Sequence, residues 1–354
     1  MSVLYLTEQN ASVRLDGETL LVRIPECEGK EAQKLRIPIG KISQVVVFGN
    51  ITLTTPAITA LIEQRSEICY LTRFGKFVGR VSGDYHKHGQ LRLRQHMAHH
   101  DPSAALHVAA TCIRSKLHNQ RTLLLRSNRV RENQELDEAA ETIGRLIEQV
   151  DALPVEATSA PDPSHPQEDT VLGQLMGIEG AAAAAYFGAY GQLFIDRWSR
   201  SFSGRHKRPP TDPINALLSY GYTLLISQAV ASAQIVGFDE YVGYLHSTQY
   251  GKPALALDIV EMFRSPVVDS VVLTILNNRM LDYNDFEETL GAWRLSERGR
   301  KIFLQKFEER LNTEITHPIL KTKVTYRRCL EIQMRLLSRW LLGELKHYRG
   351  FYTR

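Results

Sequence analysis

The chain has 354 residues, 43 Lys plus Arg against 39 Asp plus Glu, and a formal charge of +4, which alone is too small to indicate a nucleic-acid partner. Its length suggests two domains, and 43% hydrophobic with 23% charged residues excludes general disorder and a fibrous repeat. No apolar run approaches the roughly 18 residues that cross a bilayer, and the start lacks a basic signal-peptide region, so we expect a cytoplasmic protein without a membrane partner.

Residues 1–88 have the pattern of short strands. Asp16-Gly17 is a turn pair between two β-branched or alternating segments, and it predicts a tight hairpin. Further strand patterns occupy 34–39, 44–50, 67–71 and 76–81. Pro56 to Gln64 predicts one short helix, with Thr55 as its N-cap. We therefore expect a β-rich domain over residues 1–88.

After Gly89 the hydrophobic period becomes helical. The apolar residues of 135–150 recur at i, i+3, i+4 and i+7, which indicates an amphipathic helix. Residues 153–170 contain four prolines and predict a loop. Further helical patterns cover 171–200, 212–236, 255–263, 267–277, 298–313 and 323–346. The sequence thus predicts an α+β protein whose larger second domain, over residues 89–354, is all-helical.

The first candidate for chemistry is Glu179, in a segment of glycines and alanines over 175–188. The small side chains allow a neighbouring backbone to approach closely, so we expect this helix to be deeply buried. Glu179 is the only charged residue between Asp169 and Asp196. A buried carboxylate is costly unless it is paired, protonated or bound to a metal. The ordinary alternative to a metal ligand is a salt bridge with an arginine of the core.

The second candidate is the segment from His246 to Arg264. Asp258 and Glu261 are three residues apart and share one side of a predicted helix, where two like charges repel unless a cation lies between them. His246, on the preceding loop, completes a mixed nitrogen and oxygen set that suits Mg²⁺ or Mn²⁺ better than zinc. The alternative is that the acids pair with Arg264 on a solvated face and that His246 is an ordinary loop histidine.

The third candidate is the basic loop 197–208, which contains five Lys or Arg residues and no acid. Cations there would hold phosphates, and its aromatic rings would stack on bases; the alternative is a solvated charge run. A second basic stretch, residues 321–328, would extend such a surface. The residues that we expect to contact DNA are Arg197, Arg200, Arg205, Lys207 and Arg208, together with Arg264.

Other sites find less support. Five histidines gather at the predicted domain junction, and we interpret them as polar linker residues rather than zinc ligands: His86, His88, His96, His99 and His100. The four cysteines contain no CxxC pair, so a zinc knuckle is not indicated. The P-loop, the GxSxG nucleophile elbow and the HExxH motif are all missing from the sequence.

Taken together, these motifs resemble the CRISPR-associated endonuclease and integrase family, the catalytic subunit of the spacer-acquisition complex. Each motif is weak alone, but their order and spacing over the chain are specific. They are Leu175-Met176-Gly177-Ile178-Glu179-Gly180, Pro209-Pro210-Thr211-Asp212-Pro213-Ile214-Asn215-Ala216-Leu217-Leu218-Ser219-Tyr220-Gly221-Tyr222, Gly237-Phe238-Asp239, Gly243-Tyr244-Leu245-His246 and Leu257-Asp258-Ile259-Val260-Glu261-Met262-Phe263-Arg264.

The resemblance implies that Glu179, His246 and Glu261 ligate a Mg or Mn ion. Asp258 matches an acidic position that supports the catalytic site. Many relatives carry a second acid where this chain has Met262, and residues 247–250 are less basic than the family pattern. Tyr222 and Asn215 fit either a supporting role at the site or simple helix packing.

The resemblance also implies a homodimer formed through the N-terminal domains and a small ferredoxin-like partner protein. The implied reaction is the insertion of double-stranded DNA fragments, as spacers, into a CRISPR array by 3′-hydroxyl attack on a phosphodiester. Two alternatives stay open: a non-catalytic double-stranded DNA-binding scaffold with the acids as core salt bridges, and a metal-dependent hydrolase of a small phosphoester.

Overall fold

The computed structural model describes residues 2–26, 31–83, 88–154, 171–195, 197–206 and 209–353. The chain divides into two compact units, Met1–Lys87 and His88–Arg354. Of the predicted proline-rich loop 153–170, only the first two residues lie within the described ranges. Within those ranges, no helix combines the length and apolar character that crossing a membrane requires.

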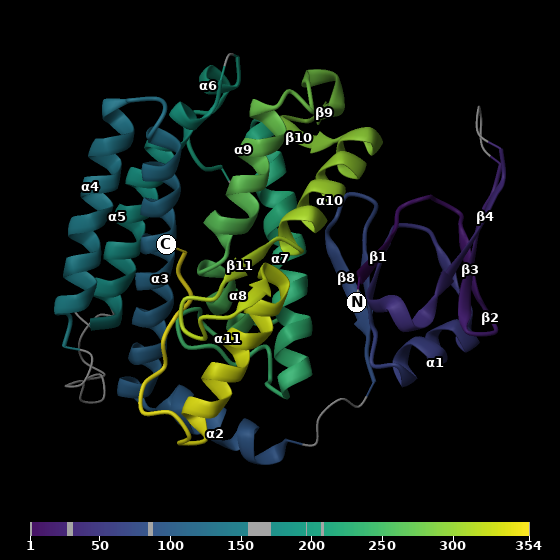
Figure 1. Cartoon of the computed structure of the whole chain (residues 1–354), viewed down its shortest axis with the longest axis horizontal. Helices are drawn as coiled ribbons and strands as arrows, with labels where there is room; N and C mark the ends of the chain where they lie inside the picture. Colours follow the sequence, from purple (N-terminus) through teal and green to yellow (C-terminus); the bar gives the residue numbers. More distant parts are fainter. Residues whose placement is uncertain are drawn as a thin grey trace. The chain divides into compact units, whose positions relative to one another are not determined.

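The N-terminal unit contains two four-stranded sheets, ordered β1-β5-β7-β8 and β4-β3-β2-β6 (Figure 1). The hairpin predicted at Asp16-Gly17 is confirmed, because β2 and β3 pair antiparallel across it and Gly17 has φ +60°. The elements are β1 (Ser2–Leu6), β2 (Ser12–Asp16), β3 (Thr19–Ile24), β4 (Gln33–Pro38), η1 (Ile39–Lys41), β5 (Ile42–Phe48), β6 (Thr52–Leu53), α1 (Thr55–Glu63), β7 (Glu67–Leu71) and β8 (Phe77–Val81).

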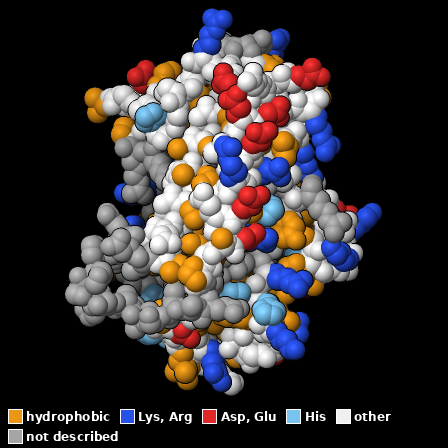
Figure 2. Space-filling model, turned by 90° about the vertical axis from the view of Figure 1, so that its left-hand side faces the viewer, with side chains coloured by type: hydrophobic (Ala, Val, Ile, Leu, Met, Phe, Trp, Pro, Cys, Tyr) orange, Lys and Arg blue, Asp and Glu red, His pale blue; other side chains and the backbone are white. Residues whose placement is uncertain are grey.

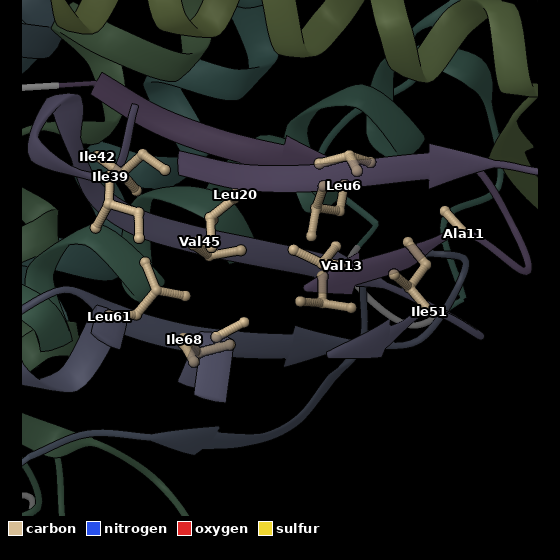
Figure 3. Close-up of a cluster of buried hydrophobic side chains, with 13 residues drawn as sticks. Leu6, Ala11, Val13, Leu20, Ile39, Ile42, Val45, Ile51, Leu61 and Ile68 are labelled. Carbon is tan, nitrogen blue, oxygen red and sulfur yellow. The ribbon is translucent and has the colours of Figure 1, made fainter. Parts of the chain in front are cut away.

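The core of this unit lies where both sheets and α1 meet. Val13 of β2, Val45 of β5 and Leu61 of α1 are fully buried in one hydrophobic cluster (Figure 3). Val13 and Val45 lie on the strand faces that point inward, and Leu61 lies on the buried side of α1. One detail differs: α1 already includes Thr55, so Thr54 is its N-cap residue.

The second unit is built mainly of helices. They are α2 (Gly89–His100), α3 (Pro102–Asn128), α4 (Gln134–Ala152), α5 (Val171–Tyr190), η3 (Gly191–Leu193), α6 (Arg197–Ser201), α7 (Pro213–Val236), α8 (Ala254–Glu261), the π-helix η4 (Arg264–Asp269), α9 (Ser270–Asn277), η5 (Tyr283–Asp285), α10 (Glu297–Leu311) and α11 (Tyr326–Leu341). The α+β class is therefore confirmed. Helices α3, α4 and α5 lie side by side (Figure 1).

This unit is not all-helical, because it also contains two short antiparallel pairs. They are β9 (Phe286–Thr289) with β10 (Ala292–Leu295), and β11 (Glu314–Thr316) with β12 (Lys323–Thr325). Leu290 and Gly291 join β9 to β10, and both have positive φ. Positive φ at both central residues is the geometry of a two-residue hairpin turn. Leucine is a rare residue at such a position, so the turn gave no clear sequence signal.

Helix caps and a stack of two aromatic rings hold the helices of this unit in place. Asp101 caps α3 by accepting hydrogen bonds from the Ser103 and Ala104 amides, and Asp212 caps α7 through the Asn215 amide. At the other end of the chain, the ring of Phe351 stacks on Phe263 at 4.6 Å between centroids. The residues after α11 thereby pack against the segment that follows α8.

Candidate active site

The structure brings Glu179 of α5 and Glu261 of α8 together around one lysine of α3. The Lys116 ammonium Nζ lies 2.8 Å from Glu261 Oε2 and donates a hydrogen bond to Glu179 Oε1. The Lys116 side chain is 7% exposed, Glu261 4% and Glu179 25%. Two predicted metal ligands, which are distant in the sequence, thus meet at one buried ammonium group.

The charges in this cluster stabilise one another. Burial opposes the charge of Lys116, but attraction by Glu261 and Glu179 outweighs it and raises the pKa of the lysine. Burial likewise opposes the charge of Glu261, yet Arg264 and Lys116 lower its pKa to about 2. Arg264 reaches the second oxygen of Glu261 at 3.0 Å. Glu261 is therefore an ionised carboxylate held between two cations.

His246 lies on the loop between α7 and α8, with Nε2 3.9 Å from Glu261 Oε1. Its Nδ1 lies 2.8 Å from Asp258 Oδ1. An ionised carboxylate only accepts hydrogen bonds, so Nδ1 donates to Asp258, and Nε2 is the ring nitrogen that faces Glu261. The three predicted ligands Glu179, His246 and Glu261 are thus gathered in one cluster.

Asp258 organises the loop that carries His246. Its fully buried carboxylate accepts hydrogen bonds from the Tyr244, Leu245 and His246 amides at 2.6, 3.1 and 2.9 Å. Gly243 is required here, because a Cβ at that position would lie 2.7 Å from Asp258 Oδ2. Since both oxygens are occupied in this way, the geometry gives Asp258 the role of a positioning residue, which acts through His246.

Helix α2 holds the same loop from another side. The Gln95 side-chain amide donates to the Asp239 and Val242 carbonyls at 2.7 and 2.8 Å. His99 Nδ1 lies 2.6 Å from the Gly243 carbonyl. Within the described ranges, which omit His86, the histidines at the junction form no metal-binding group. At least His99 has a structural role that its sequence neighbourhood does not reveal.

A buried network connects the site to the basic loop. Tyr186 and Tyr222 donate hydrogen bonds to the Asp269 carboxylate at 2.8 and 2.6 Å. Burial raises the pKa of Asp269, although hydrogen bonds from the two tyrosines and the nearby arginines oppose the shift. Tyr222 in turn lies under the guanidinium groups of Arg264 and Arg205, at 4.8 and 5.4 Å from the ring centroid.

The predicted DNA-contacting residues have different environments. Arg205 points inward and donates to Asn215 Oδ1 at 2.7 Å and Ser219 Oγ at 3.0 Å, whereas Arg200 at the end of α6 is exposed. Arg197 begins α6, but its side chain, like all of Lys207 and Arg208, lies outside the described residues. Asn215 accounts for part of its motif, because it donates to the Gly204 carbonyl at 2.8 Å and so fixes this loop to α7.

The expectation that α5 is deeply buried is wrong. Only one face of α5 is buried; it is formed by Leu175, Ala182, Tyr186, Ala189 and Tyr190. A Cβ added at Gly177 or Gly180 would have no neighbour within 4 Å. The small residues beside Glu179 therefore border open space.

On the face shown in Figure 2, basic and acidic side chains are interspersed, so the net positive charge is not concentrated there.

The donor chemistry of the cluster fits a divalent ion, although the ligands are not spaced for one as they stand. Among the described residues, no group of three or more His, Cys, Asp or Glu side chains is arranged to hold a metal. The Lys116 ammonium stands between the two glutamates. Glu261 Oε2 is occupied by the Lys116 ammonium, at 2.8 Å. Two carboxylates and an imidazole lone pair are ligands that Mg²⁺ and Mn²⁺ accept.

Sequence reasoning missed Lys116. It lies on the buried face of α3, four residues after Cys112 and three before Asn119, both fully or almost fully buried. A lysine within the apolar stripe of an amphipathic helix is unusual, because a buried ammonium needs a carboxylate partner. The position of Lys116 on the apolar face of α3 was therefore the sequence signal that could have identified it.

The comparisons first place the chain among CRISPR-associated proteins. The family model described as "CRISPR associated protein Cas1" matches residues 4–309. A Cas1 endonuclease of Moorella thermoacetica is 36% identical, over 100% of this chain and 99% of the relative. The chain belongs to the Cas1 family, which confirms the resemblance seen in the sequence.

Other relatives extend this finding. A Cas4 exonuclease/Cas1 endonuclease fusion from Geobacter sulfurreducens is 37% identical, over 99% of this chain but 60% of the fusion. Among solved structures, a Cas1 protein from Thermotoga maritima has a TM-score of 0.79 at 22% identity, covering 99% of both chains. A casposase bound to its integration product has a TM-score of 0.82 at 21% identity, covering 99% of this chain and 93% of the casposase. These two structures share the fold.

Proposed function

We propose that this protein is a divalent-metal-dependent DNA endonuclease and integrase that inserts short DNA fragments, the spacers, into a CRISPR array. The observation that carries the proposal is the meeting of Glu179, Glu261 and His246 in one partly buried cluster. The names of the relatives, which are endonucleases, support a DNA endonuclease or integrase role. The shared fold with a casposase bound to an integration product agrees with it.

The residue types explain how such a site serves phosphodiester chemistry. A Mg or Mn ion, when bound, stabilises the negative charge that develops on the non-bridging oxygens and lowers the pKa of the attacking 3′-hydroxyl. Glu179, Glu261 and His246 Nε2 would hold that ion. Asp258 orients the His246 ring through Nδ1, and Arg264, fixed between Glu261 and Tyr222, presents positive charge to a phosphate.

The exposed Arg200 and the basic loop 197–208 are proposed to hold the phosphates of double-stranded DNA. We expect Arg200→Ala to weaken duplex binding to all sequences alike and to reduce the salt slope by about 1. Fluorescence anisotropy over a salt series measures both quantities. Lys306→Ala, a change in a remote surface ion pair, is the control. An unchanged slope for Arg200→Ala would remove this residue from the DNA surface.

The partners are also proposals. We infer a homodimer formed through the N-terminal unit and assembly with a small ferredoxin-like protein. A solved Cas6-RT-Cas1–Cas2 complex has a TM-score of 0.77 to this chain at 25% identity, covering 100% of this chain and 36% of the other. A Cas2-type protein therefore fits the role of the small partner.

The test is an integration assay on supercoiled plasmid that carries an array, with and without the small partner. Glu179→Gln, Glu261→Gln and His246→Ala should each reduce strand transfer by at least about 100-fold, while duplex binding persists. Glu309→Gln, in an exposed pair on α10, is the matched control and should act like wild type. Normal strand transfer by the three variants would refute the metal site.

One observation favours the second candidate, a non-catalytic DNA-binding scaffold. Lys116 and Arg264 already neutralise the two glutamates, as they would in a purely structural salt-bridge network. This candidate predicts salt-dependent duplex binding with no strand transfer or cleavage in any divalent metal. The same plasmid assay, repeated with Mg²⁺ and Mn²⁺, therefore separates the two functions.

A further inference from the structure

We propose that Lys116 is an exchangeable internal cation: it fills the place between Glu179 and Glu261 in the metal-free protein and must withdraw when a divalent ion binds. This inference rests on the proposed metal-dependent function. It assigns the control of metal affinity to Lys116, a residue outside the predicted ligand set.

The position of Lys116 is built into the core of the helical unit. Three residues further along α3, the Asn119 side chain donates to the Met262 carbonyl at 2.7 Å, and the Asn119 carbonyl accepts from Ser265 Oγ at 3.0 Å. These bonds hold α3 against the residues on either side of Phe263. The ammonium is therefore delivered to Glu261 by the packing of two helical segments and not by a mobile surface side chain.

The lysine and a metal ion compete for the same oxygens. Lys116 contacts Glu261 Oε2 and Glu179 Oε1, the same oxygens that would hold an ion between the two glutamates. Mg²⁺ requires its oxygen ligands at about 2.0–2.1 Å. An ammonium already in contact with both oxygens prevents that approach, and its positive charge also repels a second cation nearby.

Arg264 does not compete in the same way. It contacts the other oxygen of Glu261, Oε1, and its guanidinium is supported by the ring of Tyr222. With Lys116 and Arg264 in place, two glutamates face two cations. Binding of a divalent ion then creates an excess of positive charge, which withdrawal of the lysine or arrival of a DNA phosphate relieves. Lys116 is thus the cation that exchanges, and Arg264 the one that stays.

A purely structural salt bridge makes a different prediction. Removing one partner of a buried ion pair leaves the other charge uncompensated and costs stability. Both interpretations predict a less stable metal-free protein when Lys116 becomes neutral. Only cation exchange predicts that the same substitution increases the affinity for a divalent ion.

The experiment is titration of the full chain with Mn²⁺ by isothermal calorimetry. Lys116→Met, which keeps the length of the side chain without its charge, should bind Mn²⁺ about 5–150-fold more tightly than wild type. Arg327→Met is the matched control, because it removes a half-buried cation from the remote pair with Glu308 and should leave Mn²⁺ affinity unchanged. Equal or weaker binding by a folded Lys116→Met protein overturns the inference.

Two further variants keep the outcome decisive. Lys116→Arg retains the charge and should bind Mn²⁺ no more tightly than wild type. Tighter binding by Lys116→Arg would count against exchange, and this test remains available if Lys116→Met does not fold. Glu261→Gln should abolish Mn²⁺ binding. If wild type shows Glu261-dependent binding but Lys116→Met gains nothing, only this inference fails. If neither wild type nor Lys116→Met binds Mn²⁺ through Glu261, the proposed function fails as well.

Discussion

Replacement of Asp258 by asparagine tests how the histidine loop is held. The two oxygens of Asp258 accept four hydrogen bonds, three from backbone amides and one from His246 Nδ1. An asparagine side chain has one oxygen and one NH₂ group. Whichever way its amide is turned, two of the four donors then face another donor.

The expected cost follows from the number of bonds lost. A hydrogen bond to a charged group contributes about 1.5–3 kcal/mol, so the loss of two predicts a destabilisation of about 3–6 kcal/mol. The Asp258 carboxylate is fully buried, so water cannot easily replace the missing acceptors. This is a large part of the 5–15 kcal/mol that typically separates folded and unfolded states.

Urea unfolding followed by circular dichroism measures this change. Asp239→Asn is the matched control in the same loop, because Asp239 accepts one exposed amide, that of Tyr241, at 2.9 Å. The control should lie within about 1 kcal/mol of wild type. A free energy of unfolding for Asp258→Asn equally close to wild type would show that the carboxylate does not organise the loop.

Three further outcomes are expected. In EDTA, wild type should lose on the order of 3 kcal/mol of stability as the pH falls from 4.5 toward 2, because the pKa of Glu261 is about 2 in the folded protein and 4.5 ordinarily. Glu261→Gln should lack this component in acid unfolding curves. The same pH dependence in Glu261→Gln and wild type would contradict the argument. Phe351→Ala should cost about 3–5 kcal/mol in thermal unfolding, whereas Tyr352→Ala, 39% exposed, should cost far less; similar losses would show that the Phe351 stack contributes little. Tyr222→Phe removes the 2.6 Å bond to a buried carboxylate and should cost about 1–3 kcal/mol by urea unfolding, and a neutral result would mean that the network tolerates its loss.

Much of the fold was predictable because periodicity is a local property. The change from strand to helical patterns near Gly89 predicted the α+β class, and Asp16-Gly17 predicted the first hairpin. The β9–β10 pair was not predictable, since its turn places Leu290, a residue without turn preference, at positive φ. The exposure of Gly180 was also missed, because small residues serve close helix packing and open space equally well.

The candidate site was predictable only in part. Glu179, His246 and Glu261 came from family motifs, and the structure places them in one cluster; their role as metal ligands stays a prediction. The partners of those side chains depend on tertiary packing. That Lys116 pairs with Glu179 follows from the contact of α3 with α5, which no pattern within either helix specifies.

The stacking of Phe351 on Phe263 has a consequence for how the protein opens. The Phe351 amide also contacts Met262 Sδ at 3.3 Å, and Met262 directly follows Glu261. Detachment of the chain's final segment would therefore release the end of α8 at the same moment. In hydrogen-exchange experiments, the amides of residues 351 and 353 should lose protection together with those of 262 and 263, as one cooperative unit.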